Sequence, residues 1–104
     1  ESTNIQKTQK NRTNAAVDYE TEKRRKANIN NRIKKIQKAE QDIEILEGEI
    51  ELLNENLQSS GSDYDKVKEI YSELEQKEKQ LSDIYEQWNI LNEELEQLNA
   101  ENSD

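Results

Sequence analysis

The chain has 104 residues, of which 30% are hydrophobic and 38% are charged, and its formal net charge is -9. Soluble globular domains are about 45–50% apolar and about 25% charged, so this chain is too poor in core-forming residues for a compact globule with a large buried core. It contains no Cys and no His, which excludes thiol chemistry and removes the commonest general base and metal ligand. We therefore expect no catalytic residues and no metal site here. No apolar stretch approaches the roughly 20 residues of a membrane span.

The charge is unevenly divided along the chain. Residues 1–38 hold eleven Lys or Arg against four Asp or Glu, which gives a net charge of +7. Residues 39–104 hold four bases against 20 acids, which gives -16. Because electrostatic attraction is screened over a Debye length of about 10 Å in 0.1 M salt, this local balance matters more than the total.

Residues 1–17 are dominated by Ser, Thr, Asn, Gln and Lys, with Ile5 as an isolated aliphatic residue. Such a segment cannot bury enough apolar surface to offset its ordering entropy. We expect a flexible, disordered linker over residues 1–17, followed by a folded unit over residues 18–100.

A first helix is predicted over about residues 19–58. Isoleucines at 29, 36, 43 and 50 and Leu57 recur every seven residues, and Ala39, Leu46 and Leu53 follow three residues after three of them. This is the a and d pattern of a coiled coil.

A turn is predicted over residues 59–63, Ser-Ser-Gly-Ser-Asp. Gly61 can adopt positive φ beyond the end of a helix. Ser62 with Asp65 resembles a capping box, and Asp63 is an alternative N-cap for the next helix.

A second helix is predicted over about residues 64–99, with the remaining residues 101–104 fraying. Its apolar residues again recur in a and d positions, and Lys77 is the one exception. Two helices joined by a short turn predict an all-α, antiparallel two-helix coiled-coil hairpin. Its expected core consists of Ile29, Ile36, Ile43, Leu46, Ile50, Leu53, Leu57, Val67, Ile70, Leu74, Leu81, Ile84, Trp88, Leu91 and Leu95. Matching the two apolar seams pairs positions whose numbers sum to about 124, which places Trp88 beside the small Ala39.

The sequence resembles the C-terminal coiled-coil domain of ABC-F proteins over roughly residues 17–98. The resemblance rests on Tyr19-Glu20 ahead of a basic run, the Ile/Leu-Glu helix, and Ser62-Asp63-Tyr64-Asp65 after the break. It also rests on Glu86-Gln87-Trp88-Asn89-Ile90-Leu91, with the Trp in a core position. The polar residues Asn28, Asn30 and Asn31 depart from that pattern.

The resemblance implies that the parent protein is a cytoplasmic ATPase with two ATP- and Mg-binding cassettes, acting on ribosomes in translation or on nucleic acid. The hairpin would be its accessory module, with DNA, ribosomal RNA and the cassettes of the same chain as expected partners. The cassettes themselves would lie outside this fragment, because the sequence contains no Gly-x-x-x-x-Gly-Lys-Ser/Thr loop. We therefore expect no cofactor in the hairpin itself.

The candidate nucleic-acid-binding site is the basic segment, which we define as residues 23–38. Its eight cations are Lys23, Arg24, Arg25, Lys26, Arg32, Lys34, Lys35 and Lys38. Clustered Lys and Arg bind phosphates with a strong salt dependence. The competing interpretation is that the acids Glu93, Glu94, Glu96 and Glu101 neutralise these cations across the hairpin, as interhelical pairs that set orientation.

Three further features have structural interpretations that we favour. Tyr64, Tyr71 and Tyr85 share a flank and are expected to cover the edge of the seam rather than to stack on bases. Lys77 is expected to fix the register by reaching Glu47 or another acid near the turn. The acids between Glu40 and Glu55 are expected to form a solvated face, since no calcium-binding loop is present.

Two alternatives to a monomeric nucleic-acid-binding module stay open. One is a spacer or protein-interaction hairpin that touches no nucleic acid. The other is a homodimer in which the two helices open and pair between chains, which sedimentation would reveal by a doubled mass.

Overall fold

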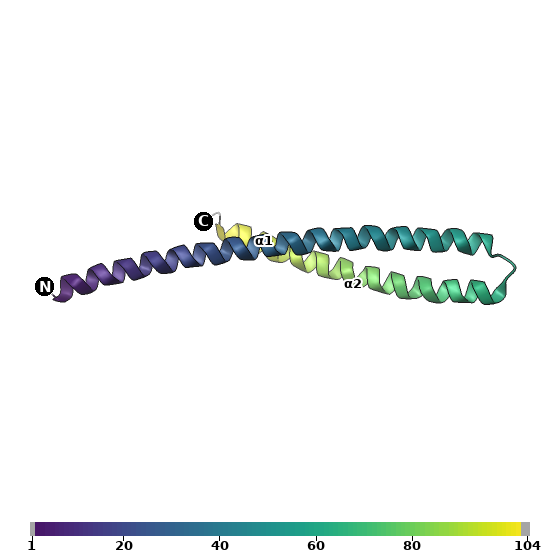
Figure 1. Ribbon diagram of the computed structural model, residues 1–104, viewed down its shortest axis with the longest axis horizontal. Coiled ribbons are helices and arrows are strands. Elements are labelled where there is room, and N and C mark those ends of the chain that lie inside the picture. Colours follow the sequence, from purple (N-terminus) through teal and green to yellow (C-terminus); the bar gives the residue numbers. More distant parts are fainter. Residues whose placement is uncertain (1, 103–104) are drawn as a thin grey trace.

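The protein forms one long helical hairpin. The computed structural model describes the backbone of residues 2–102 and the side chains of residues 16–101. Helix α1 spans Ser2–Ser59 and helix α2 spans Tyr64–Asn102. The two helices run antiparallel and side by side from the turn, and α1 continues beyond the end of α2 toward the N-terminus (Figure 1). The molecule measures 92 × 21 × 14 Å. The predicted all-α antiparallel hairpin is confirmed.

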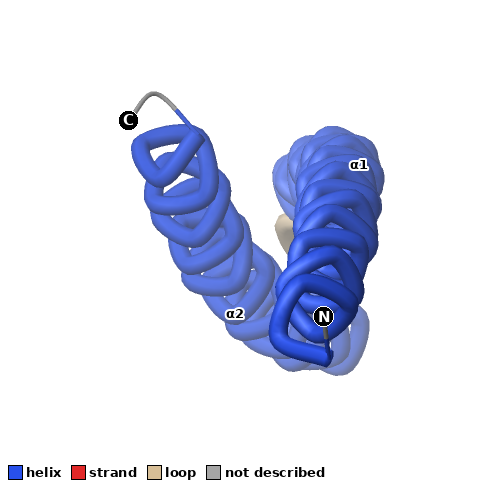
Figure 2. Tube along the Cα trace, turned by 90° about the vertical axis from the view of Figure 1, so that its left-hand side faces the viewer, coloured by secondary structure: helices blue, strands red, loops and turns tan. Residues whose placement is uncertain are grey.

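The two helices wrap around each other rather than lying in parallel planes. Viewed along the rod, α2 crosses from one side of α1 to the other between the turn and its C-terminal end (Figure 2). Crossing of this kind keeps a seven-residue apolar repeat in contact, because 3.6 residues per turn drift relative to a 3.5 repeat.

The least exposed side chains lie at the centre of the seam. Described residues with a relative exposure of 8% or less are Ile36, Ala39, Ile43, Leu46, Ile70 and Leu74. The other expected core residues, Ile29, Ile50, Leu53, Leu57, Val67, Leu81, Ile84, Trp88, Leu91 and Leu95, are half-buried. This is the limit of what two helices can achieve, since each side chain is covered by a single facing helix.

The turn is closed by short hydrogen bonds. Asp63 is the N-cap of α2: its Oδ1 accepts a hydrogen bond from the backbone N–H of Lys66 at 3.3 Å, and its carbonyl accepts from Val67 at 3.0 Å. The N–H of Asp63 donates to the carbonyl of Ser60 at 2.8 Å. Of the two predicted caps, the structure uses Asp63.

The expected positive φ at Gly61 was wrong, since no described glycine has a positive φ. The end of α1 is satisfied by hydroxyl groups instead. Ser59 Oγ donates to the carbonyl of Glu55 at 3.0 Å, and Ser60 Oγ donates to that of Asn56 at 2.7 Å. Because these side chains bond the last carbonyls of the helix, a left-handed residue is not needed for that purpose.

Helix α1 begins at Ser2, well before the expected start near residue 19. The chain has no Pro, and Gly48 is its first Gly, so no residue in this stretch breaks a helix. The flexibility expected of residues 1–17 stays a prediction, and the side chains of residues 1–15 lie outside the described residues. At the other end, α2 continues to Asn102, and residues 103–104 of the predicted fraying tail lie outside the described part. Neither helix, over its described length, is apolar enough to cross a membrane.

Candidate functional site

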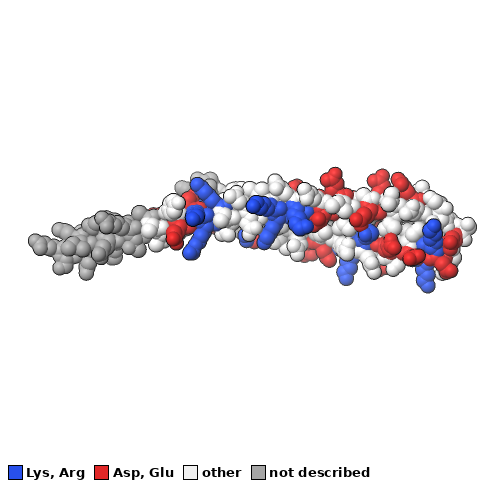
Figure 3. Space-filling model, in the orientation of Figure 1, with Lys and Arg blue, Asp and Glu red and all other residues white. Residues whose placement is uncertain are grey.

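The basic segment lies on α1, in the half of the hairpin that is far from the turn. In the space-filling view, Lys and Arg gather around the middle of the rod, whereas Asp and Glu dominate toward the turn (Figure 3). The cations of the basic segment therefore lie far from the turn, and the C-terminal part of α2, with Glu93, Glu94, Glu96 and Glu101, runs back beside them.

Two of the eight cations form exposed ion pairs within α1. Arg24 lies 3.9 Å from Glu20 and Lys38 lies 3.6 Å from Asp42, each four residues apart. Pairs of this kind contribute about 0.3–0.5 kcal/mol in a solvated helix. They are weak enough for a phosphate to compete for the cation.

The seam itself becomes polar at this end. Arg32 lies seven residues before Ala39, in line with the core, and its Nη2 donates to Glu94 Oε2 across the hairpin at 3.1 Å. Arg25 continues the same line seven residues earlier, is half-buried, and pairs with Glu22 at 3.6 Å. Arg32 is thus bound across the hairpin by a carboxylate of α2, whereas Arg25 pairs with a carboxylate of its own helix.

The other four cations are lysines on exposed positions of α1: Lys23, Lys26, Lys34 and Lys35. Among the described residues, none of these four forms an ion pair or a side-chain hydrogen bond. The basic segment thus contains two kinds of cation. The arginines are largely engaged, and these lysines face solvent.

A second interhelical ion pair lies nearer the turn. Lys77 occupies a seam position on α2, and its Nζ bonds Glu49 Oε2 on α1. The predicted register role therefore has a partner, which is Glu49 and not Glu47. The two interhelical pairs, Arg32–Glu94 and Lys77–Glu49, both join residues whose numbers sum to 126. This lies close to the predicted 124, whereas a slip by one heptad would change the sum by seven.

Of the three tyrosines on the predicted flank, Tyr85 contacts the seam. Its ring meets the edge of Trp88 at right angles, with centroids 6.4 Å apart, and its hydroxyl donates to Glu47 at 3.4 Å. Desolvation raises the pKa of Tyr85, and the negative charge and hydrogen bond of Glu47 raise it further. Tyr64 and Tyr71 are much more exposed, so they cover the seam less than expected.

The neutralisation interpretation included Glu94 and the cations of the basic segment in general, but it did not single out Arg32 as the cation that pairs across the hairpin. The heptad spacing contained the signal, since Arg32 precedes Ala39 by seven residues. No comparable sequence pattern identified Glu49 as the partner of Lys77, because α1 has several glutamates near the position expected to face Lys77. Over the described residues, no group of carboxylates is arranged to hold a metal ion.

The comparisons with known proteins give one match. The family model of the ABC transporter C-terminal domain matches residues 30–93, which cover both seams and the turn. The searches of curated proteins and of solved structures found no match. The matched region spans more than half of the chain and includes the Lys77–Glu49 ion pair and Arg32, whereas Glu94 is the first residue beyond it. The hairpin therefore belongs to the ABC transporter C-terminal domain family.

Proposed function

We propose that this hairpin is the accessory module of a cytoplasmic ABC-F type ATPase and that its basic segment binds the phosphates of DNA or ribosomal RNA. Membership of the ABC transporter C-terminal domain family supports an accessory role beside ATPase cassettes. ATP and Mg²⁺ would then be bound by those cassettes, and the hairpin would supply positioning without chemistry. On this proposal the parent protein acts on ribosomes or nucleic acid, and the hairpin is a monomer.

The observation that carries the proposal is the set of four exposed lysines without ion pairs among the described residues. Lys23 and Lys34 are eleven residues apart, which is close to three helical turns, so they share a face about 16 Å apart along the axis. Lys26 and Lys35 are nine residues apart, about two and a half turns, so they project on opposite sides of the helix. Lys23 and Lys34 can thus contact phosphates of one strand, which requires charge but no base-specific geometry, and Lys26 and Lys35 add positive charge around the helix.

The neutralisation alternative accounts for only part of the charge. Of the four glutamates expected to face the basic segment, Glu94 pairs with Arg32. Among the described residues, no ion pair involves Glu93, Glu96 or Glu101. Since Arg32 takes the interhelical carboxylate of Glu94, the exposed lysines keep their charge available to a ligand.

The test is a titration of the 104-residue chain with duplex DNA, branched DNA and structured RNA at low and moderate salt. Two variants with the same loss of charge are compared. One replaces Lys23, Lys34 and Lys35 by Gln, and the matched control replaces Lys66, Lys68 and Lys79, which lie on α2. We expect the first variant to lose most binding and to reduce the slope of log K against log salt by about two to three, at about 0.9 per phosphate contact. The control should bind as the wild type does.

Undetectable binding of all three nucleic acids at low salt would overturn the proposal and favour a spacer or protein-interaction hairpin. Equal losses in both triple variants would show that binding depends on net charge alone and not on the basic segment. Preference among the three ligands would identify the nucleic acid. Sedimentation of the free chain at micromolar concentration tests the monomer, because a homodimer would double the mass.

A further inference from the structure

Two aliphatic side chains lie on the outer side of α1 near the turn, away from the seam. Ile45 is 59% exposed and Leu52 is 60% exposed. They are seven residues apart, so they point in nearly the same direction, about 10 Å apart along the helix axis. Gly48 lies between them, and a Cβ placed there would meet nothing within 4 Å. We call Ile45, Gly48 and Leu52 the outer stripe.

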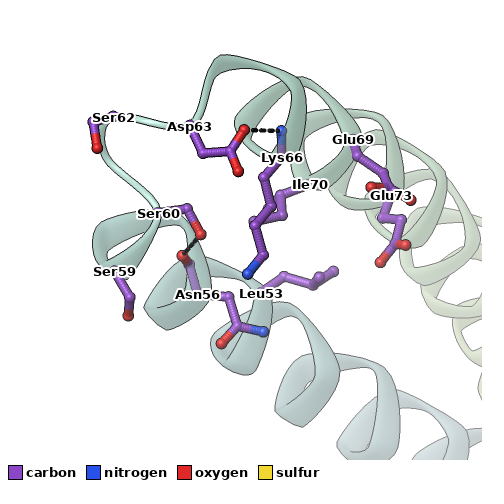
Figure 4. Close-up of a pocket in the computed structure, with 10 residues that line it drawn as sticks. All are labelled: Leu53, Asn56, Ser59, Ser60, Ser62, Asp63, Lys66, Glu69, Ile70 and Glu73. Carbon is purple, nitrogen blue, oxygen red and sulfur yellow. Dashed lines mark hydrogen bonds between the residues drawn. The ribbon is translucent and has the colours of Figure 1, made fainter.

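A groove lies beside the outer stripe, between the end of α1 and the start of α2 (Figure 4). It is open to solvent and has a volume of about 520 Å³. Its lining combines the aliphatic side chains of Leu53 and Ile70 with polar groups. Asn56 lines it from α1 and follows Leu52 by four residues, so the two are neighbours on the helix surface. The outer stripe and the groove are therefore continuous along α1.

The charge around this surface is strongly negative. Asp63, Glu69 and Glu73 line the groove, with Lys66 as the one base among its lining residues. The side chain of Lys66 extends from α2 toward α1 (Figure 4). On α1, residues 43–56, which contain the outer stripe, hold five Glu and no Lys or Arg. A second copy of the chain placed turn to turn on this surface would bring two such regions together, which like charges oppose.

We infer that the outer stripe and the groove dock a basic amphipathic helix of a partner protein. Aliphatic residues seven apart on that helix would cover Ile45 and Leu52, since both helices have the same axial spacing. Its Lys or Arg side chains would enter the groove toward Glu69 and Glu73. This surface lies between the basic segment and the turn, and Ile45 follows Lys38 by seven residues, about 10 Å along α1. The inference does not depend on nucleic-acid binding.

The probe is a fluorescent peptide of about 18 residues, roughly five helical turns, made only of Leu and Lys with Leu at i, i+3, i+4 and i+7. A peptide of the same composition without an apolar face serves as the first control. The double variant Ile45→Gln with Leu52→Gln tests the outer stripe. Ile90→Gln is its control, because Ile90 is 50% exposed on α2. Glu69→Gln with Glu73→Gln tests the groove, and Glu78→Gln with Glu86→Gln is its matched control.

We expect the double variant of the outer stripe to weaken binding by about tenfold or more, as expected when two aliphatic side chains lose their partly buried contacts. The Glu69 and Glu73 variant should weaken binding and flatten its salt dependence, and both controls should bind like the wild type. The variant lacking Lys23, Lys34 and Lys35 should also bind the peptide normally.

Four results would overturn the inference. The first is equal binding of the peptide without an apolar face, which would leave charge as the sole cause. The second is an equal effect of Ile90→Gln or of the Glu78 and Glu86 variant. The third is a loss of helicity in the outer-stripe variant by circular dichroism, which would show that Ile45 and Leu52 support the fold instead. A dimer of the free chain that the outer-stripe variant dissociates would identify a second copy as the occupant and would also overturn it.

Discussion

The Arg32–Glu94 ion pair should stabilise the hairpin more than an exposed ion pair does. Its atoms lie 3.1 Å apart, and the Arg32 and Glu94 side chains are 27% and 41% exposed. Two unit charges 4 Å apart interact by about 4 kcal/mol at an effective dielectric constant of about 20, whereas fully exposed pairs contribute about 0–1 kcal/mol. Partial burial places this pair between the two limits, and we predict a coupling energy of about 1–2 kcal/mol.

A double-mutant cycle measures this coupling. The four proteins are the wild type, Arg32→Gln, Glu94→Gln and the double variant, compared by urea unfolding followed by circular dichroism. Each single variant should lower the free energy of unfolding, because it removes the attraction near the seam. The loss in the double variant should be smaller than the sum of the two single losses by about 1–2 kcal/mol.

The matched control is the same cycle on Glu20 and Arg24, which lie 3.9 Å apart on α1 with exposed side chains. Its coupling should be about 0.3–0.5 kcal/mol. If the Arg32–Glu94 coupling is no larger than this control, the interhelical pair does not help to hold the register, and the argument from partial burial is refuted.

Three other substitutions test the packing and the electrostatics. Gly48→Ala should raise the free energy of unfolding by about 1 kcal/mol, since Gly48 lies inside α1 and a Cβ there meets nothing within 4 Å; a loss of stability in urea would contradict this. Ile43→Ala should lower the free energy of unfolding by about 2–4 kcal/mol because Ile43 is buried. Ile45→Ala should change it by at most about 0.5 kcal/mol because Ile45 is exposed. Similar losses in the two variants would show that the seam does not lie where the structure places it. Glu47→Gln should lower the titration midpoint of Tyr85 in phenolate absorbance, measured against Tyr85→Phe, because Glu47 contributes to its raised pKa. The folded state then holds this proton to higher pH than the unfolded chain, so its contribution to stability is complete below about pH 10 and is lost as pH rises through the folded pKa; an unchanged midpoint in Glu47→Gln would exclude the contact.

The hairpin and its register could be predicted because both depend on repeated local patterns. Residues such as Ile36, Ile43 and Ile50 recur every seven positions, and this spacing places them on one face whatever lies opposite. The break at residues 59–63 then leaves the two seams facing each other. Asp63 could likewise be proposed from the sequence as one of two N-caps of α2, because a capping carboxylate bonds an N–H three residues away in sequence.

Pairings between the helices depended on the tertiary structure. Lys77 pairs with Glu49 and not with Glu47. Which of these two glutamates lies opposite Lys77 depends on how the two helices cross. In the sequence, Arg32 belongs to a basic run that is typical of phosphate binding. In the structure, its guanidinium pairs with Glu94 on the facing helix. The capping of α1 by Ser59 and Ser60 in place of a left-handed Gly61 also depends on how the turn closes. Heptad periodicity is a property of each helix alone, so it can be recognised in the sequence of that helix. The partner of a long charged side chain depends on which residues of the facing helix lie within its reach.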